Sequence, residues 1–157
     1  KPDACALLDA DPHKATGLCK DYEKLTHSRA AGAADKKREL AMQICMELTV
    51  HAQIEEEIFY PALREAVGKA TEMLEEAEVE HASAKDLIAQ IQEATDIDEK
   101  FDAKVKVLGE YIDHHVKEER GEMFEKARAT RGLDLMALRD ALQARKDELM
   151  SEQEALV

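Results

Sequence analysis

The stretch HAQIEEEIFYP, residues 51–61, decides how this chain folds. Its His51 and Glu55 stand four residues apart, so on a helix both side chains project from one face, one turn above the other. The same spacing recurs at His115 and Glu119. The sequence therefore predicts two helices that each offer an imidazole and a carboxylate from a single stripe.

The residues around these pairs correspond as well, so residues 48–64 form a first copy and residues 112–128 a second copy of one pattern. The matched positions are Leu48 and Ile112, Phe59 and Met123, Tyr60 and Phe124, and Arg64 and Arg128. In each copy the stripe that carries the pair is otherwise apolar. The first stripe runs through Ile44, Leu48 (or Glu47), His51, Glu55, Ile58 and Ala62, and the second through Val105, Leu108, Ile112, His115 and Glu119, then Glu122 or Met123.

A single His–Glu pair at this spacing is more often a solvated polar pair than a metal site. Here the apolar stripes are expected to place both pairs in a helical core. A buried carboxylate without a partner is destabilising or becomes protonated, and a bound cation removes that cost for both pairs at once. Inward-facing His and Glu on several helices are how bundles hold pairs of metal ions. The pattern therefore predicts one shared metal site.

The composition predicts an all-α protein. The chain has 157 residues, enough for a sizeable core, and we expect residues 1–157 to form a single domain. Charged residues make up 36% of the chain and aromatic residues only 4%. Three prolines and six glycines leave long periodic runs, whereas strands favour β-branched and aromatic residues.

Charge and cysteine usage restrict the partners and the location. The formal net charge of −13 is expected to repel nucleic acid and anionic membranes, although solubility explains most of this charge. The three cysteines include no C-x-x-C pair, and an odd number of buried, inert thiols favours a reducing, cytoplasmic location. No apolar run approaches a membrane span, and no signal-peptide core is visible near the start.

Apolar periodicity predicts five helices. The expected ranges are about 4–30, with a kink or a helix restart at Pro12, about 36–66, with a bend at Pro61, then about 71–92, 99–130 and 133–153. Asp35 is the expected N-cap of the second helix and Gly68 its C-cap, and Thr71 belongs to the expected cap of the third. The first four helices form the bundle, over about 4–130, and the last is an accessory helix.

The third helix carries a further candidate ligand, His81. It lies on an apolar stripe of Leu74, Ala77, His81, Ala84, Ile88 and Ile91. Aligning residues 11–12 with 80–81 also matches the first helix to the third, so the bundle is expected to consist of two related hairpins with a site between them. In this register Pro12 is the partner of His81, and His13 stands one residue away.

These motifs resemble those of the hemerythrin-like, or HHE, cation-binding family over roughly residues 4–130. The specific segments are His51-x-x-x-Glu55 followed by EEIFYPAL, then HVKEE at residues 115–119 and EVEH at residues 78–81. The resemblance implies an antiparallel up-down four-helix bundle that holds two non-haem iron ions with an oxo or hydroxo bridge. It further implies that Glu55 and Glu119 bridge the ions and that His51, His81 and His115 are terminal ligands.

Four positions depart from the family pattern. Pro12 stands where the first helix of the family usually carries a histidine, and Lys85 stands where oxygen-carrying members have a second histidine on the third helix. Arg120 and Glu125 replace an expected acidic residue and an expected proline. The first departure leaves one metal site incomplete, and the second argues against oxygen transport.

His13 is the candidate replacement for the missing metal ligand. On an ideal helix it stands about 100° from the inner face, although the break at Pro12 allows the next turn to rotate. We expect that His13 does not fully replace the ligand and that water or another side chain completes the site. The remaining histidines, His27 and His114, are expected to be exposed. The tyrosines Tyr22, Tyr60 and Tyr111 are expected to pack in the core.

Three functions fit this sequence. The first is a non-haem di-iron protein that binds or reacts with dioxygen, peroxide or nitric oxide in sensing or stress response, with redox chemistry as its only expected enzymatic activity. The alternative is an iron-buffering or metal-responsive module without turnover, whose last helix is a regulatory or dimerising face, so that a homodimer is expected. The third is a structural bundle with a decayed site. The sequence shows no nucleophile triad, phosphate loop or aromatic nucleic-acid platform.

Overall fold

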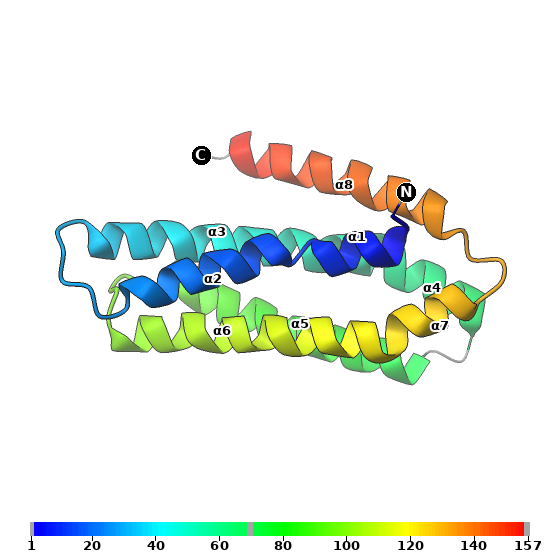
Figure 1. Ribbon diagram of the computed structural model, residues 1–157, viewed down its shortest axis with the longest axis horizontal. Helices are drawn as coiled ribbons and strands as arrows, with labels where there is room; N and C mark the ends of the chain where they lie inside the picture. Colours follow the sequence, from blue (N-terminus) through cyan, green and yellow to red (C-terminus); the bar gives the residue numbers. More distant parts are fainter. Residues whose placement is uncertain (1, 69–70, 156–157) are drawn as a thin grey trace.

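The computed structural model describes residues 2–68 and 71–155, and within these residues the chain consists of helices joined by short connections, without a strand (Figure 1). This confirms the predicted all-α class. The elements are α1 (Ala4–Ala10), α2 (His13–Leu25), α3 (Ala33–Ile54), η1 (Glu55–Phe59), α4 (Tyr60–Val67), α5 (Thr71–Glu93), α6 (Glu99–Glu118), η2 (Glu119–Met123), α7 (Phe124–Ala129) and α8 (Leu135–Ala155). The elements η1 and η2 are single π-helical turns between α-helical segments.

These elements form four antiparallel arms of one bundle, as predicted. The arms are α1 with α2, α3 through α4, α5 alone, and α6 through α7 (Figure 1). Helix α2 packs against α3 and α6, and α5 packs against the same two helices from the other side. Sequential arms are therefore neighbours, and each short connection joins adjacent helices of opposite direction.

The first arm breaks where the sequence predicted a kink or restart. Helix α1 ends at Ala10, Asp11 is its C-cap, and Pro12 is the N-cap of α2. Proline has no backbone N–H and its ring collides with the preceding turn, so one continuous helix cannot pass through this position. The break leaves the Asp11 side chain beside His51 of the second arm, where it becomes part of the site described below.

Helix ends differ from the prediction at two places. The first arm ends at Leu25 rather than near residue 30. The N-cap of α3 is Gly32 rather than Asp35, and its φ of 83° is a left-handed conformation that glycine adopts without steric cost. Gly68 ends α4 as predicted, with a φ of 66° and a bond from its N–H to the Arg64 carbonyl. The expected cap at Thr71 falls next to residues 69–70, which lie outside the described residues.

Two π-helical turns shift the inner stripes by one residue. The Tyr60 N–H bonds to the Glu55 carbonyl, five residues back, and the Phe124 N–H bonds to the Glu119 carbonyl in the same way. A π-turn inserts one residue into an α-helix, so the face that points inward advances by one position. The prediction that Ile58 and Ala62 continue the first stripe is therefore wrong, since Phe59 and Leu63 are the buried residues there.

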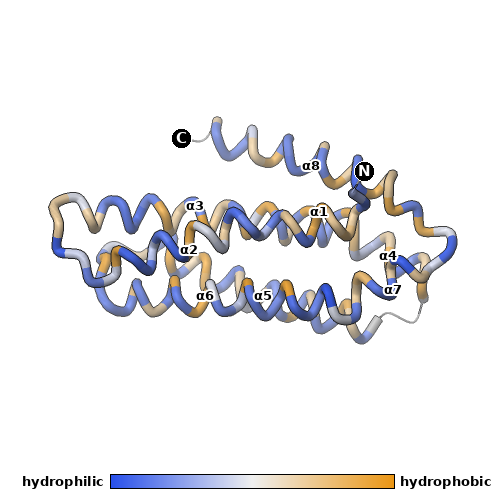
Figure 2. The backbone as a smooth tube through the Cα atoms, viewed as in Figure 1, coloured by the Kyte–Doolittle hydropathy of each residue, from blue (hydrophilic) through white to orange (hydrophobic). Residues whose placement is uncertain are grey.

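The core consists of two hydrophobic clusters, one toward each end of the bundle. The cluster near the α4 and α7 end includes Leu8, Phe59, Leu63 and Phe124, and the other includes Ile44, Ile91, Phe101 and Leu108. Figure 2 shows apolar positions along the inward faces of the arms and polar ones on the outside. The buried histidines and glutamates lie between the two clusters.

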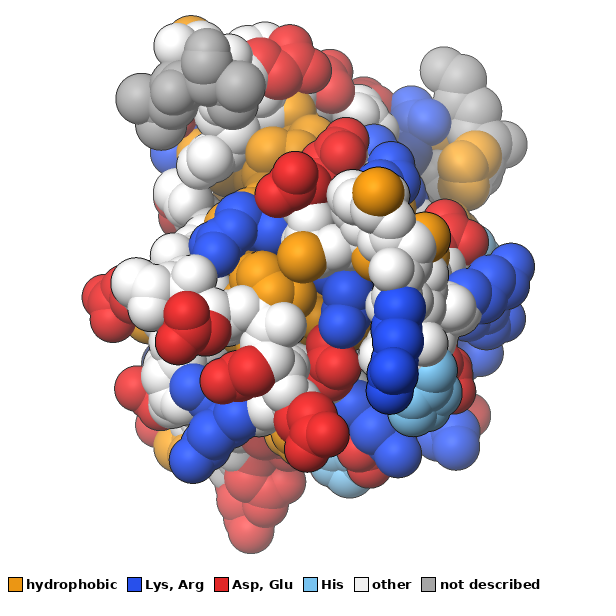
Figure 3. Space-filling model, turned by 90° about the vertical axis from the view of Figure 1, so that its left-hand side faces the viewer, with side chains coloured by type: hydrophobic (Ala, Val, Ile, Leu, Met, Phe, Trp, Pro, Cys, Tyr) orange, Lys and Arg blue, Asp and Glu red, His pale blue; other side chains and the backbone are white. Residues whose placement is uncertain are grey.

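Helix α8 lies outside the bundle and packs against α1, α3 and η1 (Figure 1). Its Leu142 and Leu149 are buried, and burying each such side chain contributes about 2 kcal/mol. At the end of the bundle where α2 connects to α3 and α5 to α6, charged side chains surround a small apolar patch (Figure 3). None of the described helices is both long and apolar enough to cross a membrane.

The three thiols are free and embedded in packing. Cys5 and Cys45 are buried and Cys19 is half-buried. Burial raises the pKa of Cys5 and of Cys45 to about 12, and that of Cys19 to about 11. Such thiols stay protonated and unreactive at neutral pH.

Candidate metal centre

Five of the six predicted ligands meet inside the bundle. His51 lies near the end of α3, His81 in the middle of α5 and His115 near the end of α6, while Glu55 and Glu119 are the first residues of the two π-turns. All five side chains lie on inner faces and are between 0% and 5% exposed. Three arms therefore supply three imidazoles and two carboxylates to one buried polar layer.

Glu55 lies close to all three histidines of this layer. Its Oε1 lies 3.3 Å from His51 Nε2, 3.3 Å from His81 Nε2 and 3.1 Å from His115 Nε2. The Oε1 atom of Glu119 lies 2.7 Å from His115 Nε2 and 3.8 Å from His51 Nε2. The three imidazoles thus each point their Nε2 atom toward the space between the two carboxylates.

The donor atoms fit a metal centre. Ligand atoms of His51, Glu55, His115 and Glu119 all lie within 4.8 Å of one another. The second carboxylate oxygens, Glu55 Oε2 and Glu119 Oε2, are buried and have no hydrogen-bond partner among the described residues, and the same holds for His51 Nε2. Buried polar atoms normally find partners, so these free lone pairs match the positions that metal ions would take. The mixed set of nitrogen and oxygen donors suits divalent transition metals.

Without a metal, protons balance the charge in this layer. Burial lowers the pKa of His115, but the charges of Glu55 and Glu119 outweigh it and raise that pKa to about 10. The pKa of His51 is raised in the same way, chiefly by Glu55. Burial raises the pKa of Glu55, but the two imidazolium ions lower it well below its usual range. Burial and the neighbouring Glu55 charge instead raise the pKa of Glu119.

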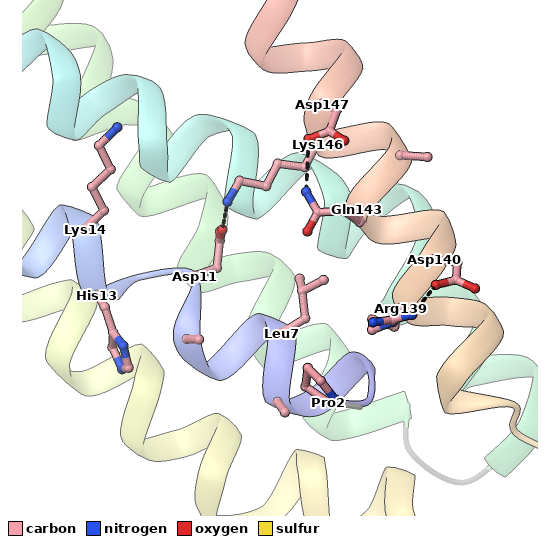
Figure 4. A pocket seen from close by; sticks show the side chains of 13 residues that line it. Pro2, Leu7, Asp11, His13, Lys14, Arg139, Asp140, Gln143, Lys146 and Asp147 are labelled. Atoms are coloured by element: carbon pink, nitrogen blue, oxygen red, sulfur yellow. Dashed lines mark hydrogen bonds and ion pairs between the residues drawn. The ribbon is translucent and has the colours of Figure 1, made fainter.

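The structure does not bring His13 to this layer. Pro12 is buried and borders an enclosed cavity of about 20 Å³ beside His51, His81 and His115, whereas His13 is exposed and turned away from Asp11 (Figure 4). The helical register continues through the break, so Pro12 keeps the inner position and His13 stays outside. Assigning His13 as a metal ligand therefore conflicts with this geometry, and the expectation that it does not replace the missing histidine agrees with it.

Asp11 supports His51 in a way that was not predicted. Its Oδ2 accepts a hydrogen bond of 2.8 Å from His51 Nδ1, and its Oδ1 pairs with Lys146 Nζ of α8 (Figure 4). Burial raises the pKa of Asp11, but the bond with His51 and the Lys146 charge lower it below its usual range. A carboxylate behind a ligating imidazole fixes the ring and its tautomer, leaving the other nitrogen for the metal. The only sequence signal was an acidic residue directly before Pro12.

Two tyrosines border the layer rather than only filling the core. The Tyr60 hydroxyl lies 3.3 Å from His81 Nε2, and the Tyr111 ring stacks on His115 with ring centroids 5.6 Å apart. The third, Tyr22, packs in the core as expected and donates a hydrogen bond of 2.7 Å to Asp102. His27 and His114 are exposed, as predicted.

Two departures from the family pattern form ion pairs at the surface. Lys85 lies 2.6 Å from Glu56 and is half exposed, so it does not reach the centre. Arg120 pairs with Asp9 and ties η2 to α1. An acidic residue at position 120 would place a negative charge beside Asp9 instead.

The comparisons with known proteins agree with this geometry. A family model described as the hemerythrin HHE cation binding domain matches residues 3–127. A hemerythrin HHE cation binding domain-containing protein from Mycobacterium kansasii has a similar fold, with a TM-score of 0.75 and 18% identity over 97% of this chain and 90% of that one.

A curated relative, a DNA nickase from Nostoc sp., is 29% identical over 99 residues. The match covers 63% of this chain but only 28% of the nickase, so the chain spans about a quarter of that protein's length. The matched family model, together with the buried His–Glu layer, establishes that this chain belongs to the hemerythrin HHE cation binding domain family and carries a candidate metal site.

Proposed function

We propose that this chain holds two non-haem iron ions and uses them to bind or react with a small oxidant such as dioxygen, peroxide or nitric oxide. The observation that carries this proposal is the convergence of three imidazole Nε2 atoms on Glu55 Oε1, beside a second carboxylate and an enclosed cavity. Glu55 and Glu119 would bridge the ions, and His51, His81 and His115 would be terminal ligands. When bound, iron supplies redox chemistry toward the oxidant.

The cavity beside Pro12 offers only a small space next to the three histidines. It is lined by the three histidines and by apolar side chains such as Leu48, Ile88 and Ile112, and its volume is about 20 Å³. A space of this size holds about one water molecule. On this side of the centre there is therefore room for a diatomic molecule or peroxide but not for a larger substrate.

Tyr60 is a proton donor at the border of the centre, with its hydroxyl 3.3 Å from His81 Nε2. Its side chain is 1% exposed, and burial together with the Glu55 and Glu119 charges raises its pKa above the ordinary range. The phenol therefore keeps its proton at neutral pH. It lies where it can donate a hydrogen bond to a small ligand or to a carboxylate of the site.

Metal loading tests the proposal directly. Anaerobic loading with ferrous iron should give two ions per chain, and admission of air or peroxide should produce near-ultraviolet absorption that the apoprotein lacks. A matched Glu55→Ala variant should show neither the stoichiometry nor the absorption. A wild-type protein that stays colourless with sub-stoichiometric iron would contradict the proposal.

Iron buffering without turnover is the second candidate. It is favoured by Lys85, which pairs with Glu56 at the surface and leaves the centre with three histidines. Both candidates predict that iron raises the melting temperature, because binding to the native state stabilises it. Only the first predicts that the loaded protein consumes peroxide, so peroxide decay in the presence of loaded and metal-free protein separates them.

A further inference from the structure

A second cavity connects the candidate centre with the surface between α5 and η2. It has a volume of about 250 Å³, and five of the residues that line it are glutamates, Glu76, Glu80, Glu118, Glu119 and Glu122. Glu76, Glu118 and Glu122 are exposed, whereas Glu119 and His115, which also line it, are buried in the centre. The cavity therefore extends from solvent to two candidate ligands.

The lining of this cavity carries acidic side chains without a lysine or arginine to offset them. No lysine or arginine lines it, and within the described residues Glu76, Glu80 and Glu122 form no ion pair with a lysine or arginine. The cavity between α1 and α8 is different, since Lys14, Arg139 and Lys146 line it (Figure 4). The cavity between α1 and α7 is lined by Arg120 and Arg128. Of these three cavities, only the one between α5 and η2 is lined by acidic residues without a lysine or arginine.

Two observations at this cavity point to a cation. At its inner end, Glu119 is 3% exposed, and its Oε2 atom has no hydrogen-bond partner among the described residues. Near the surface, ligand atoms of Glu80, His114 and Glu118 lie within 4.8 Å of one another, and Glu80 Oε2 is likewise buried without a partner. Donor groups for a cation therefore stand at both ends of one cavity.

We propose that this acid-lined cavity is the route by which divalent cations reach the centre, with Glu80, His114 and Glu118 as a transit site on the way. The inference rests on the proposed function, because it assigns a path to the metal that the centre would hold. Clefts lined by one sign of charge concentrate counter-ions and accelerate association by roughly 10- to 1,000-fold. Glu76, Glu80 and Glu122 attract the ion, and the inner pair, Glu119 and His115, receives it.

The rate of cobalt uptake tests this route apart from any activity. Apoprotein is mixed with Co²⁺ in a stopped-flow instrument, and the rise of the visible cobalt absorption reports filling of the centre. The variant Glu76→Gln/Glu80→Gln/Glu122→Gln should fill about 10-fold more slowly at low ionic strength, with unchanged final stoichiometry. The difference should shrink in high salt, because ions screen the exposed charges.

The matched control removes the same charge elsewhere on the same two arms of the bundle. Glu93, Glu99 and Glu110 are exposed, lie on α5 and α6, and do not line the cavity. The variant Glu93→Gln/Glu99→Gln/Glu110→Gln should fill at nearly the wild-type rate. Equal slowing of both triple variants would mean that only the net charge matters and would overturn the route, as would equal rates of the cavity variant and the wild type.

A steric variant tests the same route without changing charge. Gly121 lines the cavity, and a Cβ atom added there meets nothing within 4 Å. Gly121→Leu should therefore place a side chain in the path and slow uptake, whereas uptake at the wild-type rate would count against the route. Wild-type protein that takes up no cobalt would overturn the proposed function itself. Stoichiometric uptake that neither variant slows would overturn this inference alone.

Discussion

The two copies of the His–Glu pattern have the same backbone conformation and differ in their surroundings. Both pass from an α-helix into a π-turn that begins at the glutamate. In the first copy, Asp11 and Lys146 hold His51 from behind, and Glu55 contacts three imidazoles. In the second copy, His115 and Glu119 border the acid-lined cavity. One copy is thus held by packed helices, and the other borders a cavity that extends to the surface.

The same motif therefore has two different environments, one held by hydrogen bonds from other helices and one bordering a cavity. The first copy lies under α1 and α8, where a buried carboxylate and a lysine orient His51. The second copy borders the cavity that we propose as the route of an arriving ion. Substitutions in the first copy should therefore affect how tightly metal is held more than the equivalent substitutions in the second.

The largest expected effect is that of Glu55→Ala. Among the described residues, this change removes the one carboxylate that lies within 3.3 Å of all three imidazoles. We expect no iron to remain bound after gel filtration. Iron analysis of the eluted protein measures this, and a variant that retains two ions per chain would refute the central position of Glu55.

The equivalent change in the second copy, Glu119→Ala, should have a smaller effect. Glu119 makes one close contact, 2.7 Å from His115 Nε2, and a longer one of 3.8 Å to His51 Nε2. Three imidazoles and Glu55 remain, which is enough to ligate one ion. We expect one iron per chain by titration under nitrogen, and equal losses in the two glutamate variants would remove the distinction between the copies.

Asp11→Asn tests the brace behind the first copy. An asparagine keeps the shape but loses the charge that orients His51 and pairs with Lys146. Removing such a carboxylate typically weakens metal affinity by roughly 10- to 100-fold. Competition with a chromophoric chelator measures the change. Unaltered affinity would show that His51 is positioned by packing alone.

Lys146→Met should have a smaller effect in the same direction, because it acts on His51 only through Asp11. We expect weakening of about 10-fold or less. The neighbouring Arg145 pairs with Glu57 rather than with Asp11, so Arg145→Met is the matched control on α8 and should leave affinity unchanged. If both variants weaken binding equally, the effect comes from docking of α8 and not from the Lys146–Asp11 contact.

The smallest expected effect is on stability, at the other end of α1. Asp3 caps α1 through the Ala6 N–H and pairs with Arg128 of α7, which lowers its pKa. Asp3→Asn should cost about 1 kcal/mol or less, because Arg128 is half exposed and the cap is partly kept.

The sign of the pH effect follows from that lowered pKa. The contribution of Asp3 is fully present above the pKa of the unfolded chain and is lost as the pH falls through the folded value. The difference between wild type and Asp3→Asn in urea unfolding should therefore be constant near neutral pH and shrink in acid. A difference that grows as the pH falls would contradict the ion pair as its source.

The four arms and the burial of the five candidate ligands could be predicted from the sequence because their stripes are long and regular. His81 and its apolar neighbours all lie on the inner face of α5. The π-turns escaped prediction, because a period of 3.6 residues contains no sign of an inserted residue, and Phe59 therefore replaced Ile58 in the core. The cap at Asp35 was wrong, since Gly32 supplies a left-handed residue three positions before the expected cap.

The contacts around the centre escaped prediction for a different reason. Lys146 reaches Asp11 from the far end of the chain, and no local spacing relates the two residues. Arg120 likewise looked like an isolated departure until its partner Asp9 was placed beside it. Such contacts depend on how α8 and α1 dock onto the bundle, and only the tertiary structure contains that information.

The most direct test of the central claim is metal analysis of protein purified without chelator and then loaded anaerobically with ferrous iron. The account predicts two iron ions per chain in the wild type and none in Glu55→Ala. Wild-type protein that binds no iron, or that binds as much iron as Glu55→Ala does, would contradict the claim that the buried His–Glu layer is a metal centre.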